Sequence, residues 1–106
     1  MTNDKRSHLH EILNQIELEL KNIQLWEDNI PAAESLASQQ PFAIDTLTPT
    51  QWLQWIFLPK MRYLLEIGAD LPNNIAIHPY FEQTLAQADC AQLLKWLKEI
   101  DKTCRA

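Results

Sequence analysis

The sequence predicts an all-α fold: one domain over residues 1–106, a bundle of about four main helices with a short extra helix and a kinked, buried central helix. Apolar residues recur at spacings of three and four, which is the helical period. The chain has a single glycine, which disfavours strand-and-turn architectures and suits helices joined at prolines. A hydrophobic content of 46% with four tryptophans can supply one core at this length.

The first helix is predicted over residues 4–26. Six apolar residues fall in one arc roughly 100° wide, as in a helix that faces a core: Leu9, Ile12, Leu13, Ile16, Leu20 and Ile23. Glu17 and Lys21 form an i,i+4 pair in the favourable orientation. A short helix over residues 32–38 is expected after Pro31, because proline can open a helix.

The central helix is predicted over residues 48–67. Thr48 and Gln51 have the spacing of a capping box, and Gly68 can supply the left-handed residue after the last turn. Pro59 lacks the N–H that would bond the carbonyl of Trp55, so a kink is expected there. The preceding segment is expected to insert three apolar side chains into the bundle: Phe42, Ile44 and Leu47.

Two further helices complete the predicted bundle. One is expected to begin at residues 78–79, and Asp89 with Gln92 has the pattern of a cap for the last one. Cys90 and Cys104 would lie about 21 Å apart along one helix axis, which is beyond disulfide reach. We therefore predict two reduced, partly buried thiols.

A polar stripe on the central helix gives the first candidate site. It consists of Gln51, Gln54, Leu58 and Arg62, with Trp55 projecting into it. A tryptophan among such neighbours has the composition of an interface hot spot, so these residues are candidates for partner binding. The alternative is that Trp55 is half-buried against a neighbouring helix or against the Phe42 loop.

A second anomaly on the same helix is a lysine within an apolar arc. Lys60 falls among Leu53, Ile56, Leu64 and Ile67, and a buried charge has to pair or reach water. The candidates for buried polar groups are Asp45, Thr46, Lys60 and Tyr80. A structural ion pair with Asp45 and a phase change at Pro59 that exposes Lys60 are both open.

A basic stripe on the last helix gives the third candidate site. It consists of Lys95, Lys98, Lys102 and Arg105. Such a stripe can contact phosphates, or it can be a solvated face with cations near a helix C-terminus. The net charge of −5 argues against generic nucleic-acid binding.

The sequence contains no catalytic motif of a known class, such as GxSxG, a Walker A loop, HExxH or CxxC. We therefore expect a protein that is not an enzyme and holds no cofactor. No metal site is expected either, because His8 and His10 are two residues apart and diverge on a helix. No apolar run approaches the ~20 residues of a membrane span, and the first residues are too polar for a signal peptide. Cytoplasmic residence is expected.

Four strings of residues carry a family resemblance: Gln40-Pro41-Phe42, Asp45-Thr46, Trp52-Leu53-Gln54-Trp55 and Pro59-Lys60-Met61. They resemble the YqcC-like family of small bacterial helical proteins. Where that family has Pro-Arg-Met, this chain keeps the charge but loses the forked guanidinium. The resemblance implies an all-α bundle and an association with tRNA pseudouridine synthase C, without a catalytic residue of its own.

Three hypotheses of function follow. The first is a protein-interaction module, associated with the synthase through Trp55, Leu58 and Arg62; an exposed apolar patch at Trp55 would favour it. The second is an RNA-contacting accessory domain that uses the basic stripe, favoured by a positive surface spanning two helices. The third is an unrecognised enzyme, favoured by a deep pocket that contains Asp45, Lys60 and Tyr80.

Overall fold

The computed structural model describes residues 4–71, 76–85 and 90–105, apart from the side chains of residues 4 and 105. Every regular element in these ranges is helical, so the all-α prediction is confirmed. In chain order the elements are α1 (Asp4–Asn22), α2 (Ala33–Leu36), a 3₁₀ turn (Pro41–Ala43), α3 (Pro49–Trp52), a π-helix (Leu53–Phe57), α4 (Leu58–Ile67), α5 (His78–Thr84) and α6 (Ala91–Arg105).

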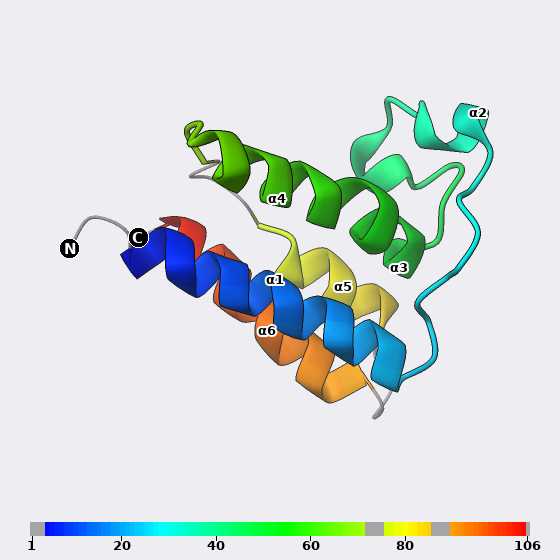
Figure 1. Ribbon diagram of the computed structural model, residues 1–106. Helices are drawn as coiled ribbons and strands as arrows, with labels where there is room; N and C mark the ends of the chain where they lie inside the picture. Colours follow the sequence, from blue (N-terminus) through cyan, green and yellow to red (C-terminus); the bar gives the residue numbers. More distant parts are fainter. Residues whose placement is uncertain (1–3, 72–75, 86–89, 106) are drawn as a thin grey trace.

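The helices α1 and α6 lie side by side and run in opposite directions (Figure 1). The first turn of α1 and the last turn of α6 therefore lie at the same end of the molecule. Helix α5 packs on α6, and α4 packs on α1. The central helix thus lies across one side of the α1–α6 pair, as Figure 1 shows in green over blue.

The core lies where these helices meet. The predicted apolar arc of α1 is confirmed for five of its six members, which are fully buried: Leu9, Ile12, Leu13, Ile16 and Leu20. The sixth, Ile23, lies beyond the end of α1 and is half-buried. The five buried members meet a matching set from α6, which consists of Leu93, Leu97, Ile100 and Cys104. Cys90 and Cys104 are both buried and are not joined by a disulfide, and burial raises the pKa of the Cys104 thiol.

The central helix begins and ends as its local sequence predicts. The Thr48 hydroxyl accepts from the Gln51 backbone N–H, and the Gln51 side chain accepts from the Thr48 backbone N–H. Gly68 is left-handed at φ 70° and its N–H donates to the carbonyls of the last turn. Such local signals depend on residues three or four apart, so they are readable in the sequence.

The expected disturbance at Pro59 takes the form of a wider turn. Residues Leu53–Phe57 are a π-helix, in which the Leu58 N–H donates to the Leu53 carbonyl. A π-turn inserts one extra residue and changes the direction in which later side chains point. This accommodates a proline in the second position of α4 without leaving the α3–α4 axis visibly broken (Figure 1).

Two loop predictions require correction. The first helix ends at Asn22 rather than at residue 26, because Gln24 is left-handed and the next two N–H groups turn back to the Leu20 carbonyl. Ile44 is exposed instead of inserted, because the 3₁₀ turn buries Ala43 in its place. Asp89, half of the predicted cap of the last helix, lies outside the described residues.

Candidate functional site

The polar stripe of the central helix faces the segment that follows α1. Gln51 Nε2 donates to both carboxylate oxygens of Glu27, at 3.2 and 3.1 Å. Trp55 Nε1 donates to one of the same oxygens at 3.2 Å. Gln54 Oε1 accepts from the Glu27 backbone N–H at 2.8 Å, and Gln54 Nε2 donates to the Glu27 carbonyl at 2.7 Å. Glu27 alone therefore provides hydrogen-bond partners for three side chains of the stripe.

The prediction that this stripe is an exposed surface is wrong for two of its members. Leu58 is fully buried and Gln54 is 4% exposed, because the segment around Glu27 and helix α1 cover this face. Trp55 is half-buried, as the alternative interpretation expected. Arg62 is half-buried and turned toward α1, where its Nη2 lies 2.7 Å from Glu17 Oε1 and donates to Asn14 at 3.2 Å.

The predicted set of buried polar groups is also largely wrong. Asp45, Thr46 and Lys60 are exposed, and Tyr80 is half-buried. Asp45 accepts a hydrogen bond from Ser38 and Thr46 donates to the Ser35 carbonyl, so both serve the local loop. No ion pair between Asp45 and Lys60 occurs. The π-turn before Pro59 supplies the phase change that places Lys60 in solvent.

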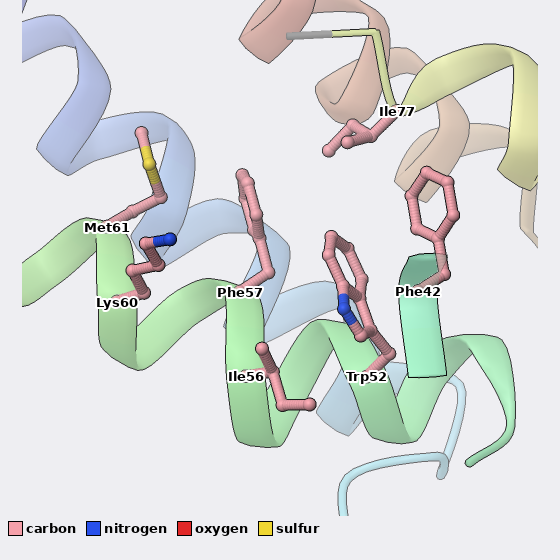
Figure 2. Close-up of a pocket in the computed structure, with 7 residues that line it drawn as sticks. All are labelled: Phe42, Trp52, Ile56, Phe57, Lys60, Met61 and Ile77. Carbon is pink, nitrogen blue, oxygen red and sulfur yellow. The ribbon is translucent and has the colours of Figure 1, made fainter. Parts of the chain in front are cut away.

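An open pocket of about 410 Å³ lies beside Lys60. The other lining residues that the structure describes are apolar: Phe42, Trp52, Ile56, Phe57, Met61 and Ile77. Figure 2 shows Trp52, Phe57 and Met61 projecting from the same side of the central helix, with Ile77 above Trp52 and Phe42 beside it. The volume is within the range of about 300–1,000 Å³ typical of ligand pockets. Neither Asp45 nor Tyr80 lines it, so the combination that would favour an enzyme is not assembled there.

A strained turn holds one wall of this pocket. Phe42 and Ala43 have φ angles of 58° and 48°, a conformation that costs non-glycine residues about 1–3 kcal/mol each. The Phe42 ring stacks on Tyr80 at 4.1 Å and meets Trp52 edge-on at 4.8 Å. Trp52 in turn stacks on Phe57 at 5.4 Å. These contacts fix the aromatic wall of the pocket.

The basic stripe of α6 is solvent-exposed at Lys95, Lys98 and Lys102. The Arg105 side chain lies outside the described residues. The surface toward α1 is not uniformly positive, because Glu99 Oε1 lies 3.4 Å from His8 Nε2. The stripe is thus accessible, but a carboxylate interrupts it where the two helices meet.

Sequence reasoning missed two acidic residues with structural roles. Asp101 is 3% exposed, and its carboxylate oxygens accept from the backbone N–H groups of Ile77 at 2.9 Å and His78 at 2.8 Å. It therefore caps α5 from the neighbouring helix. The sequence did contain one sign that Asp101 is buried, namely its position within the apolar arc of α6. Glu27 gave no comparable signal, because its partners lie 24 to 28 residues further along the chain.

The described part of the chain offers neither a cluster of metal ligands nor a membrane-spanning helix. No group of three or more His, Cys, Asp or Glu side chains in residues 4–71, 76–85 and 90–105 could hold a metal ion. Within the same ranges, no helix has the length and apolar character needed to cross a bilayer.

These features define a class: a small all-α bundle with an aromatic pocket marked by one lysine. The chain belongs to the YqcC-like family, since the family model DUF446, described as tRNA pseudouridine synthase C, matches residues 8–103. It is 42% identical to an uncharacterized protein of Haemophilus influenzae, over 89% of this chain and 85% of the relative. It is 37% identical to the uncharacterized protein YqcC of Escherichia coli, over 96% and 91%.

Two further comparisons bear on fold and context. The solution NMR structure of protein YqcC from E. coli superimposes with a TM-score of 0.84 at 31% identity, over 95% of this chain and 88% of that one. A tRNA pseudouridine synthase C of Pectobacterium carotovorum is 36% identical over 70 residues, which is 66% of this chain but 19% of the synthase chain. The similarity to that enzyme is therefore partial.

Proposed function

We propose that this chain is a non-catalytic accessory protein that binds another protein, and that its partner is a tRNA pseudouridine synthase. The observation that carries the proposal is the partial match to the P. carotovorum protein: the matched segment makes up 19% of a chain named for that activity. Two modules in one chain meet at high effective concentration. When the same modules are separate chains, a binding surface has to bring them together.

The chemistry of the pocket supports binding rather than catalysis. Lys60 is the one titratable group in its described lining, and the other members are apolar. General acid–base catalysis needs positioned groups that give and take protons, and nucleophilic catalysis needs a nucleophile beside a base. An apolar concavity with one charged group is instead suited to recognising a partner.

The experiment is a binding measurement between the full-length purified chain and the tRNA pseudouridine synthase C of the same organism. Size-exclusion chromatography with light scattering should give a complex with the summed mass, and calorimetry should give its dissociation constant. In parallel, the chain alone, incubated with unmodified tRNA, should form no pseudouridine by mass spectrometry. Separate elution at the highest attainable concentrations, or modification by the chain alone, would contradict the proposal.

The exposure of Lys95, Lys98 and Lys102 favours one alternative, direct contact with RNA. Phosphate contacts make binding steeply salt-dependent, so fluorescence anisotropy with labelled tRNA should show affinity that falls as salt rises. Lys98→Glu should then weaken binding at every salt concentration. Absence of tRNA binding at low salt would remove this alternative.

A further inference from the structure

An exposed stripe extends from the pocket along α4. Lys60, Tyr63 and Ile67 are spaced by three and four residues, which places them together on one helix face. Tyr63 is 59% exposed and Ile67 is 55% exposed. Ile56, four residues before Lys60, is half-buried and lines the pocket. Pocket and stripe therefore form one surface, which we call the α4 surface: the pocket lining together with Tyr63 and Ile67.

The charge on the α4 surface is local and positive. Lys60 is exposed and forms no ion pair or hydrogen bond with any residue the structure describes. It lies among aromatic and aliphatic side chains, although the chain as a whole carries a net charge of −5. An isolated cation in apolar surroundings selects a partner that brings a carboxylate next to an apolar group.

Resting on the proposed function, we propose that the α4 surface is the docking site for an amphipathic helix of the synthase with an acidic residue beside its apolar face. One large apolar side chain of that helix fills the pocket between Trp52 and Ile77. A carboxylate one turn away pairs with Lys60, and the remaining apolar face lies along Tyr63 and Ile67. This is the helix-in-groove mode, with anchors at helical spacing.

The geometry favours a helix over the other modes of protein recognition. Residues 4–71, 76–85 and 90–105 contain no strand edge that a peptide could extend. The exposed apolar groups of the α4 surface, Tyr63 and Ile67, lie on a single helix, and a second helix can run alongside it. RNA is disfavoured at this surface, because one lysine among apolar side chains offers little to a phosphate backbone.

The experiment compares dissociation constants for the synthase between the wild-type chain and variants of its exposed residues. Lys60→Glu places a negative charge against the proposed carboxylate and should weaken binding about tenfold or more. Ile67→Asp should weaken it by a similar factor, while Lys60→Arg should retain it. Lys98→Glu is the matched control: it makes the same charge change at an exposed position of α6 and should stay within about twofold.

Stability and mass measurements make each outcome decisive. All three substituted positions are exposed, so unfolding midpoints in urea should match wild type. If the wild-type chain binds and Lys60→Glu and Ile67→Asp bind equally well, the docking site is wrong and the accessory function stands. If the wild-type chain does not bind the synthase, the proposed function fails and the docking site with it. The docking site would also be overturned if Lys98→Glu weakened binding to the synthase as much as Lys60→Glu does. The same holds if the wild-type chain forms a homodimer that Lys60→Glu disrupts.

Discussion

At the scale of single residues, two carboxylates connect segments that are distant in sequence. Asp101 joins α6 to the first turn of α5, and Glu27 joins the segment after α1 to the central helix. Asp101 accepts from two backbone N–H groups, and the backbone N–H and carbonyl of Glu27 itself are bound by the Gln54 side chain. Buried backbone groups need partners, so these two residues determine how the segments meet.

Asp101→Ala should destabilise the protein by about 2–4 kcal/mol. The substitution leaves the N–H groups of Ile77 and His78 without their acceptor, and an unsatisfied buried donor costs about 1–3 kcal/mol. Asp101→Asn should lose less, because its amide oxygen still accepts. Urea unfolding measures both, with Lys102→Ala as the exposed neighbour control. An unchanged midpoint for Asp101→Ala would mean that water replaces the carboxylate.

The number of residues that separate two interacting groups explains which roles could be predicted from the sequence. The capping box at Thr48 and Gln51 involves groups three residues apart, so its pattern is visible in the sequence. Asp101 and Ile77 are 24 residues apart, and only the packing of α5 on α6 brings them together. The position of Asp101 within the apolar arc of α6 indicates burial, but it does not identify the backbone groups that Asp101 binds.

At the scale of elements, the central helix shows how a correct pattern can receive a wrong interpretation. The stripe that contains Gln54, Trp55 and Arg62 is real, but Gln54 is buried and the hydrogen bonds of the stripe go to other parts of the same chain. The helical spacing of apolar and polar residues does not by itself say which segment covers a helix face. The π-turn adds a second effect: by changing the phase before Lys60, it moves the exposed surface to Tyr63 and Ile67.

The ion pair between α1 and α4 gives a pH prediction. A hydrogen bond from Lys21 at 2.8 Å and the nearby Arg62 hold the pKa of the Glu17 carboxyl below its ordinary value, against a smaller opposing effect of burial. A lowered folded-state pKa stabilises the fold above the unfolded-state pKa of about 4.3, and this contribution disappears as pH falls through the folded-state value.

Glu17→Gln should therefore lower the urea midpoint at pH 7 and have no effect once the pH lies below the folded-state pKa of Glu17. At pH 7 the loss in free energy of unfolding should be below about 1 kcal/mol, because the ion pair is partly solvated. Unfolding curves between pH 7 and pH 2.5 measure the difference from wild type. Glu11→Gln, an exposed position on the same helix, is the control. A difference that persists unchanged at the lowest pH would exclude the ionised carboxylate as its cause.

At the scale of the whole molecule, the α1–α6 pair supplies the core, and the central helix with its preceding loop supplies the pocket. The core could be predicted, because its apolar stripes belong to long uninterrupted helices. The pocket could not, because it depends on a left-handed Phe42, on a π-turn and on Ile77 from another segment. The family resemblance added the fold and an association, but it did not locate this surface.

Leu97→Ala tests the division between core and surface. Leu97 is fully buried on α6 among the residues that meet α1, and removing such a side chain costs about 2–5 kcal/mol, depending on how far the cavity collapses. Leu18→Ala is the matched control on α1, where the leucine is 51% exposed and the same change should stay within about 0.5 kcal/mol. Both substitutions leave a good helix former in place. The difference between the two therefore reports burial rather than helix propensity.

Urea unfolding followed by far-ultraviolet circular dichroism measures each free energy. Equal small losses would mean that α6 is not seated on α1 in solution.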